Sequence, residues 1–302
     1  MPSTREIRRR IGSIKNIGQI TKAMQMVATS KMRRAQERVQ QSRPYAEQLR
    51  GMVSRLARAA GEDVGTEAVL MAERPIHKIG YLLITPDGGL CGALPSNINR
   101  RAIHSIRDVQ REVAGQDGSV QGDEAINIVA VGRKGRDFVV RSPYHLLAEF
   151  TNYGTQPGLN DAAAIAQVAV EAFVKGEVDV VYLVYAKFVN TVTQLPTVVK
   201  LLPVEPPAEE EDNEKKNVEY IYEPDPQSLF AALLPRYVDL QVYLAMLESL
   251  ASQWSAQMVA MKNATDSASE LLEDLKLTYN KARQASITTQ ILEVVSGAEA
   301  LG

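Results

Sequence analysis

A glycine-rich loop after an apolar, strand-like run is the first feature that could support chemistry. The loop reads Asp87-Gly-Gly-Leu-Cys-Gly92, and a turn of this kind before a helix can hold phosphate on its backbone N–H groups. It fits neither the dinucleotide pattern G-x-G-x-x-G nor the P-loop pattern, and no lysine follows it. A tight turn leading into a helix is therefore the favoured interpretation, and a solvated loop is favoured for Gly132-Arg-Lys-Gly135.

The other reactive side chains form no recognisable catalytic pattern. Cys91 is the single cysteine, which excludes an intramolecular disulfide and a cysteine metal cluster. A nucleophilic thiol also needs a base and an orienting group, and none lies nearby in the sequence. Three scattered histidines, His77, His104 and His145, do not suggest a zinc site. The sequence therefore offers no convincing catalytic site, and we predict no catalytic residues, no metal and no cofactor. A dinucleotide-dependent enzyme, the weaker alternative, would need a ligand fingerprint that the sequence lacks.

Two long helical patterns occupy the ends of the chain. Residues 4–43 contain no proline, and their apolar or small residues recur at steps of three or four, which predicts a helix with one packed stripe. This stripe is Ile7, Ile11, Ile14, Ile17, Ile20, Met24, Ala28, Met32, Ala35 and Val39. The helix is expected to continue past Pro44 as far as Ala59.

The C-terminal pattern is more regular. Residues 236–296 contain neither proline nor glycine, and an alternating 4-3 step runs through them, which predicts a left-handed coiled coil. The seam is Leu240, Leu244, Leu247, Ala251, Trp254, Met258, Met261, Thr265, Ala268, Leu272, Leu275, Tyr279 and Ala282. Some 60 residues of helix span roughly 90 Å, too long to be buried within one domain. The N-terminal helix is the available partner, in an antiparallel arrangement.

Charge supports this pairing. Residues 1–60 hold 14 Lys and Arg against three acids, and residues 205–302 hold seven Lys and Arg against 17 acids. A basic segment alone would suggest nucleic acid, and a basic nucleic-acid-binding coiled coil remains the alternative. A matched acidic segment instead indicates that the two ends lie together, and it would repel phosphate.

The middle of the chain predicts a small α/β domain with a mainly parallel sheet. Apolar strand-like runs at 78–85, 125–131 and 178–188 alternate with helical patterns at 96–113, 133–141 and 161–175, as in β–α–β units. Residues 191–202 and 218–222 are expected to form a hairpin beside the sheet, and 205–216 an exposed loop. The predicted segments are 1–60, 75–222 and 226–302.

The end of the C-terminal helix indicates a partner surface. Its heptad seam decays after Ala282, while apolar residues spread around the helix, and a helix that is apolar on several sides is covered by a partner or aggregates. These residues are Ile287, Ile291, Leu292, Val294 and Val295. A polar stripe of Arg283, Gln284 and Thr288 lies just before them and suits directional contacts.

Three separated motifs resemble one known family. The first is Ile11-x-x-Ile14-x-Asn16-x-x-Gln19-Ile-Thr-Lys-Ala-Met24-x-Met-Val-Ala28-x-x-Lys31. The second is the closing helix, with Met258-Val-Ala-Met-Lys-Asn-Ala-Thr-Asp266 and Leu277-Thr-Tyr-Asn-Lys-Ala-Arg-Gln-Ala-Ser-Ile-Thr288, ending Val295-Ser-Gly-Ala298. The third is Tyr222-Glu-Pro-Asp-Pro226, which precedes that helix. Together they resemble the gamma subunits of F-type, H⁺-transporting ATP synthases, and the resemblance covers essentially the whole chain.

The resemblance implies an α/β fold, in which a long antiparallel coiled coil accompanies a small Rossmann-like domain. It also implies a central-stalk rotor that couples proton translocation to ATP synthesis or hydrolysis. The implied partners are the alpha and beta subunits, the epsilon subunit and the membrane c-ring, with no nucleic acid. The implied location is peripheral, at the cytoplasmic face of a bacterial plasma membrane.

Site residues follow from the same resemblance. Contacts to beta are expected from Lys22, Met24, Arg283, Gln284 and Thr288, and an apolar tip bearing from Ile291, Leu292, Val294 and Val295. A foot near the c-ring and epsilon is expected from Tyr222, Glu223, Asp225, Lys31 and Arg34. Two positions depart from the family pattern: Gly88 replaces an arginine and Gln290 replaces a glutamate, so a salt bridge from position 290 becomes at best a neutral hydrogen bond.

Overall fold

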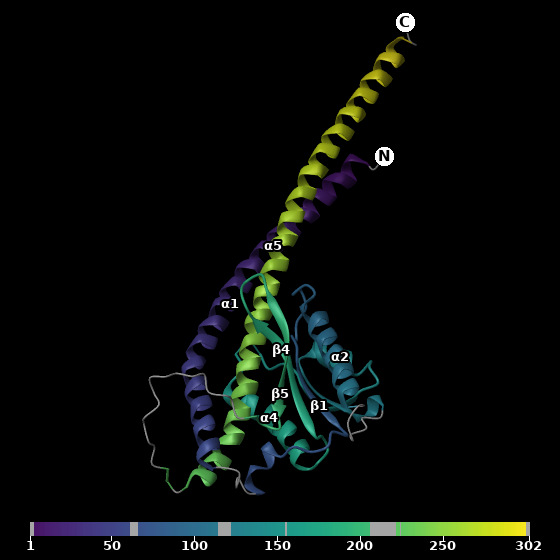
Figure 1. The fold of residues 1–302 in the computed structure, drawn as a ribbon. Helices are drawn as coiled ribbons and strands as arrows, with labels where there is room; N and C mark the ends of the chain where they lie inside the picture. Colours follow the sequence, from purple (N-terminus) through teal and green to yellow (C-terminus); the bar gives the residue numbers. More distant parts are fainter. Residues whose placement is uncertain are drawn as a thin grey trace. The chain divides into compact units, whose positions relative to one another are not determined.

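The computed structural model describes residues 3–60, 66–113, 122–154, 156–205, 222–223 and 225–299. Packing groups the chain into two compact units: Met1–Thr29 with Gln257–Gly302, called the helix-pair unit below, and Ser30–Ala256, called the α/β unit. The two longest helices, α1 (Thr4–Ala60) and α5 (Pro226–Glu299), each contribute to both units (Figure 1). The predicted segments follow the secondary-structure elements, whereas the packing brings together the outer parts of both long helices.

The α/β unit contains a five-stranded sheet in the order β3-β2-β1-β4-β5. The first four strands in the chain are mutually parallel, and β5 pairs antiparallel with β4. The strands are β1 (Ile79–Ile84), β2 (Ile126–Val131), β3 (His145–Phe150), β4 (Val180–Phe188) and β5 (Gln194–Leu202). The prediction of a mainly parallel sheet is confirmed.

One strand of the sheet was not predicted from the sequence, and one predicted hairpin can be compared with the structure only in part. Strand β3 has the half-exposed pattern of an edge strand, which gives a weaker apolar signal than the buried β1 and β2. The predicted strand in residues 191–202 is present as β5 and pairs with β4. Its expected partner at 218–222 lies almost entirely outside the described residues, as does most of the loop predicted at 205–216.

Helices cover both faces of this sheet. On one face α2 (Leu94–Val113) and α3 (Arg133–Val139) bury an apolar cluster that includes Tyr81, Ile98, Ile106 and Val139. On the other face α4 (Leu159–Val174) packs together with residues 53–56 of α1 and 230–246 of α5. Short 3₁₀ turns lie at Thr66–Met71 and Asp123–Ala125. These parts of the two long helices therefore pack into the core of the α/β unit, beside the sheet (Figure 1).

Local chemistry defines the start of α5. The backbone N–H and the hydroxyl of Ser228 both donate to the carboxylate of Asp225, at 2.8 Å each, as expected of an N-cap residue. Pro226 is the first helical residue, where its missing N–H costs nothing. Pro235 lies inside the helix, and the complete burial of the neighbouring Phe230 and Leu234 helps to offset its cost.

One stretch of α5 is long and apolar enough to be a candidate membrane span by composition alone. Its best 18-residue window has a mean hydropathy of 1.2, and 39% of that window is buried inside the protein. A partly buried core helix passes the same test, so this property is weak evidence for membrane insertion.

Candidate functional site

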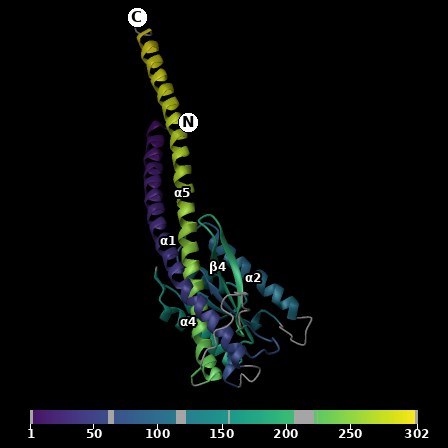
Figure 2. The ribbon, with the colours of Figure 1, turned by 60° about the vertical axis from the view of Figure 1, so that its left-hand side comes forward.

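In the helix-pair unit, α1 and α5 lie side by side and antiparallel in both views (Figures 1 and 2). The C-terminal seam predicted from the heptad pattern is confirmed, because its members are the less exposed residues of this part of α5. They are Met261, Thr265, Ala268, Leu272, Leu275, Tyr279 and Ala282. The pairing predicted from the opposite charges of the two ends is confirmed as well.

The seam of α1 differs from the prediction at two positions. Ile17 and Ile20 are 49% and 59% exposed, whereas Gly18 and Thr21 occupy the seam between the buried or half-buried Ile14 and Ala28. Gly18 approaches the Cβ of Ala268. The prediction of Ile17 and Ile20 as seam residues was wrong. At this level the facing residues of α5 are small or polar, so glycine and threonine pack against them better than isoleucine does.

Two contacts anchor the register of this helix pair. The hydroxyl oxygens of Thr21 and Thr265 lie 2.8 Å apart. Nearer the chain ends, Arg8 donates to the phenolic oxygen of Tyr279 at 2.8 Å, and its guanidinium lies 5.6 Å from the centre of the same ring. Each hydroxyl also lies within hydrogen-bond distance of a carbonyl of its own helix, Thr21 of Gly18 at 3.1 Å and Thr265 of Met261 at 2.8 Å, so either threonine can donate to the other.

Beyond Ala282, α5 has no partner helix in the described residues, because α1 begins at Thr4. The C-terminal end of α5 extends past the N-terminal end of α1 in both views (Figures 1 and 2). Arg283, Gln284 and Thr288 are all exposed there. The Thr288 hydroxyl donates to the backbone carbonyl of Gln284 at 3.0 Å. The side chains of Arg283 and Gln284 are both exposed to solvent.

The apolar residues of the tip are strongly exposed. Ile291, Leu292, Val294 and Val295 have exposed fractions between 53% and 72%. They occupy nearly consecutive positions of a helix, so they face several directions around its axis. Such a surface is uncommon on a protein that acts alone and indicates a partner that encloses the tip.

Lys22 and Met24 lie on α1, at a different level from the polar stripe of α5. Lys22 is exposed and Met24 is half-buried beside the seam. Since Thr21 faces Thr265, about 18 residues of α5 separate this level from Arg283, or roughly 27 Å. The structure therefore does not bring the two predicted groups of beta contacts together.

The predicted foot residues also fall at two levels of the α/β unit. Lys31 places its ammonium 4.3 Å from the centre of the Trp254 ring, and Arg34 is exposed. Tyr222 packs against the apolar cluster under the sheet, Glu223 is exposed, and Asp225 caps α5. About 29 residues of α5 separate Trp254 from Asp225, which is roughly 40 Å, so these residues form two surfaces.

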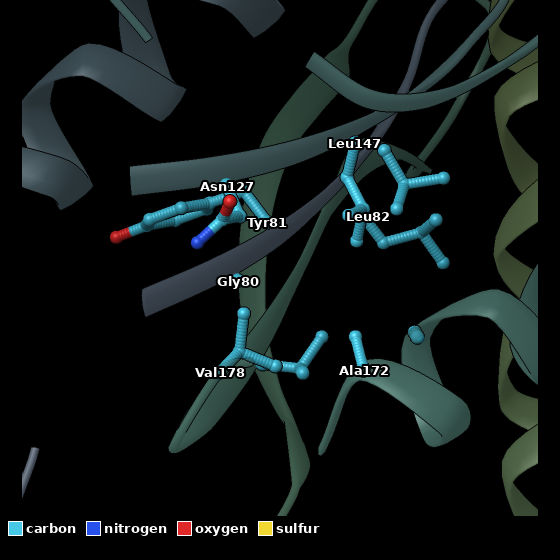
Figure 3. Close-up of a pocket in the computed structure, with 10 residues that line it drawn as sticks. Gly80, Tyr81, Leu82, Asn127, Leu147, Ala172 and Val178 are labelled. Atoms are coloured by element: carbon cyan, nitrogen blue, oxygen red, sulfur yellow. The ribbon is translucent and has the colours of Figure 1, made fainter. Parts of the chain in front are cut away.

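A small cavity of the α/β unit lies against the sheet (Figure 3). Its volume of about 10 Å³ is close to the minimum that holds one water, so this cavity has no room for a substrate. Its lining is almost wholly apolar: Gly80, Tyr81, Leu82, Asn127, Val129, Leu147, Ala169, Ala172, Val178 and Val181. In the described part of the chain no group of His, Cys, Asp and Glu is placed to hold a metal ion.

The carboxyl ends of β1, β2 and β3 are tied together by side chains of the protein itself. The carboxylate of Asp87 accepts the backbone N–H groups of Arg133 and Asn152, each at 3.0 Å. Tyr153 donates to the carbonyl of Thr85 at 2.9 Å, and burial raises the pKa of that phenol. Burial likewise raises the pKa of the Cys91 thiol, which disfavours the thiolate that a nucleophile requires.

These features define a protein that combines an antiparallel helix pair with a doubly wound α/β unit and whose exposed tip is suited to binding other chains. The family model described as ATP synthase matches residues 3–301. An ATP synthase gamma chain of Roseiflexus castenholzii is 48% identical over 303 residues, covering 100% of this chain and 99% of that one. A gamma chain of Pelotomaculum thermopropionicum is 44% identical over 301 residues and covers all of both chains.

Solved structures agree on the fold. A chain of the Tetrahymena thermophila mitochondrial ATP synthase central stalk and c-ring matches with a TM-score of 0.57 and 26% identity, over 81% of this chain and 99% of that one. A chain of the Euglena gracilis mitochondrial ATP synthase matches with a TM-score of 0.64 and 21% identity, over 99% and 94%. The chain belongs to the ATP synthase gamma chain family.

Proposed function

We propose that this chain is the central-stalk rotor subunit of an F-type ATP synthase, coupling proton translocation in the membrane sector to ATP synthesis or hydrolysis in a ring of alpha and beta subunits. The observation that carries the proposal is the unpaired C-terminal end of α5, which exposes apolar residues on several sides. Membership of the gamma chain family supplies the identity of the partner. No observation favours the nucleic-acid alternative.

Coupling by such a chain requires differential contact. Each catalytic subunit of a ring that encloses the tip contacts a different side of the tip at each rotational position. A contact shifts a conformational equilibrium only when its affinity for the two conformations differs. The outer part of α5 is a single helix with Arg283 and Gln284 on it, so it has no rotational symmetry. Turning it therefore changes the contacts of each catalytic subunit in sequence.

Within this proposal each group of site residues has a separate part. Arg283, Gln284 and Thr288 make polar contacts to beta, and Lys22 and Met24 meet a moving segment of beta at a lower level of the helix pair. Ile291, Leu292, Val294 and Val295 turn inside an apolar sleeve. A sleeve without fixed hydrogen bonds holds the tip by hydrophobic contact, which is not directional and so permits rotation.

The membrane-side part of the proposal rests on the α/β unit. Tyr222, Glu223, Asp225, Lys31 and Arg34 are proposed to lie near the c-ring and the epsilon subunit, at the cytoplasmic face of a bacterial plasma membrane. Lys31 and Asp225 already engage Trp254 and Ser228, so Arg34 and Glu223 are the side chains most available for partners. The chain itself is proposed to carry no catalytic residue and to act as a subunit of the complex.

Native mass spectrometry of a complex purified through a tag on this chain tests the proposal. The expected result is one copy of this chain with a hexamer of two alternating nucleotide-binding subunits, together with Mg-ATPase activity. A lone chain or a homodimer recovered from gently solubilised membranes would contradict it. A complex in which nucleic acid replaces the nucleotide-binding subunits would favour the alternative.

A further inference from the structure

The outward face of α2 carries a line of basic side chains. Arg100, His104, Arg107 and Arg111 are all exposed and follow one another at steps of four, three and four residues. This spacing places them on one line along the helix, over roughly 16 Å. The buried residues of α2 lie on its opposite side, against the sheet. The line, called the α2 basic stripe below, therefore faces away from the core of the α/β unit.

The α2 basic stripe is electrostatically unfavourable within the chain itself. Positive charges four residues apart on one face of a helix repel each other, as in the pair Arg107 and Arg111. Arg100 and Arg107 have no ion-pair partner in the described part of the chain. Arg111 lies 3.9 Å from Asp108, and both of these side chains are strongly exposed, so that ion pair is weak. Most of the positive charge of the stripe is therefore uncompensated.

The arginines on and just after α3 show that the same unit pairs its other positive charges. Arg133 donates to the amide oxygen of Asn152 at 2.7 Å. Arg136 donates to the carboxylate of Asp137 at 2.8 Å, and Arg141 donates to the backbone carbonyl of Asp137 at 2.7 Å. Both α2 and α3 cover the same face of the sheet. On this face the α3 arginines are engaged, whereas the stripe remains available to another molecule.

The chemistry of the stripe and its borders favours an acidic helix as the occupant. Guanidinium groups bind carboxylates with bidentate geometry, and a helix with carboxylates three or four residues apart presents them in a line of the same spacing. A helix that lies on a lipid surface exposes apolar residues beside its basic ones, but α2, which is described along its whole length, has no strongly exposed large apolar side chain. Asp108 and Glu112 border the stripe on one side, where a broader polyanion such as a DNA duplex would meet them.

From these observations we propose that the α2 basic stripe is a docking surface for an acidic helix of a partner protein. The guanidinium groups of Arg100, Arg107 and Arg111 pair there with carboxylates of the partner. No residue proposed above to contact beta, epsilon or the c-ring lies on α2, so this surface does not depend on the proposed rotor function. Its failure and the failure of that function are separate results.

Titration of the full-length chain with a labelled helical peptide tests the proposal. The matched peptide is alanine-rich and carries four glutamates at steps of four, three and four residues. A control peptide of the same composition distributes its four glutamates around the helix. Fluorescence anisotropy at low ionic strength is expected to show that the matched peptide binds about fivefold more tightly than the control peptide. The affinity of the matched peptide should fall as salt is added.

Two charge-removing variants locate the contact. Arg107→Gln should weaken binding of the matched peptide about fivefold, because one ion pair of the stripe is lost. Arg101→Gln is the matched control, since Arg101 is exposed on the same helix but lies roughly a quarter of a turn away from the stripe. It should change the affinity by less than about twofold. Both side chains are exposed, so both variants should keep the fold, which circular dichroism checks.

Three outcomes would overturn the proposal. The first is equal affinity for the two peptides, and the second is an equal loss of affinity in Arg107→Gln and Arg101→Gln. The third is tighter binding, at the same salt, to vesicles of equal parts phosphatidylglycerol and phosphatidylcholine or to a DNA duplex. That result would assign the α2 basic stripe to a lipid surface or to nucleic acid instead.

Discussion

Glu248 on α5 carries a carboxyl group that the α/β unit buries without fully satisfying. Its oxygen Oε2 is buried and has no hydrogen-bond partner. Burial raises the pKa of this carboxyl above its usual range, and the positive charges of Lys187 and Arg43 and the backbone of Phe188 only partly oppose the shift. The ionised form of the Glu248 carboxyl group is therefore destabilised in the folded protein.

This residue gives a prediction about pH. Because the pKa in the folded state is the higher one, the folded protein binds more protons between the unfolded pKa, about 4.3, and the folded pKa, and stability falls as pH rises through that window. Glu248→Gln should remove this part of the pH dependence and raise the free energy of unfolding at pH 7. Urea unfolding at several pH values measures it. An unchanged pH profile in Glu248→Gln would contradict the assignment.

Gly132 gives a second prediction at the residue scale. Its φ is 93°, and a Cβ at this position would overlap the carbonyl oxygen of Thr85. Gly132→Ala should lower the free energy of unfolding by about 3 kcal/mol or more, the sum of backbone strain and a steric clash in the core.

Gly154→Ala is the matched control, because Gly154 also has a positive φ of 76° but no atom within 4 Å of the added Cβ. Its cost should be limited to backbone strain, about 1–2 kcal/mol. Equal losses in the two variants, measured by urea unfolding, would remove the steric part of the argument.

At the scale of elements, the antiparallel helix pair depends on a small and polar stretch within an otherwise apolar seam. The hydroxyl oxygens of Thr21 and Thr265 lie 2.8 Å apart across the seam, and Gly18 lies against Ala268 on the adjacent turn. Helices can approach closely where side chains are small, and a polar pair at a seam position tends to fix the register of a coiled coil.

A double-mutant cycle with Thr21→Val and Thr265→Val tests this contact. Each single change removes one hydroxyl and leaves the other facing a methyl group, whereas the double change produces an apolar pair of the same shape. The double variant should be more stable than the sum of the single changes predicts, by about 0.5–1 kcal/mol. Amide exchange of residues 18–25 and 262–269 reports it, and strict additivity would count against a direct hydrogen bond.

Much of this element-scale structure could be predicted from sequence. The α5 seam has one dominant stripe of apolar residues, so its heptad pattern was unambiguous. In α1 two stripes compete, and Ile17 and Ile20 are apolar by type but lie outside the seam. Only the facing Thr265 and Ala268 explain why Gly18 and Thr21 are chosen instead. A local pattern cannot contain that information, because it resides in the other helix.

The candidate site shows the same division. The decay of the seam after Ala282 predicted an exposed tip, and the exposed fractions of the tip residues agree with it. The wide separation of Lys22 and Met24 from Arg283 and Gln284 gave no sequence signal, because it depends on the register of the two helices. That register is known only from contacts such as the one between Thr21 and Thr265.

At the scale of the whole molecule, coupling is proposed to depend on the outer part of α5. Replacing Arg283 and Gln284 together by alanine should reduce ATP-driven proton pumping and Mg-ATPase activity of the assembled complex severalfold, since two directional contacts of about 1 kcal/mol each are lost. Both side chains are exposed and alanine favours helix, so the helicity of the isolated chain should not change. Normal turnover in a fully assembled complex would remove these two residues from the contact set.

Rotation of this chain within its complex is the property on which the proposed function depends. Val192 is 76% exposed in the turn between β4 and β5, whereas Cys91 is buried, so Val192→Cys provides a single reactive thiol for an optical probe. With the alpha and beta ring fixed to a surface and MgATP supplied, we expect one-directional rotation of the probe in steps of a third of a turn, one for each catalytic subunit. A probe that stays still while the same complexes hydrolyse ATP would contradict it.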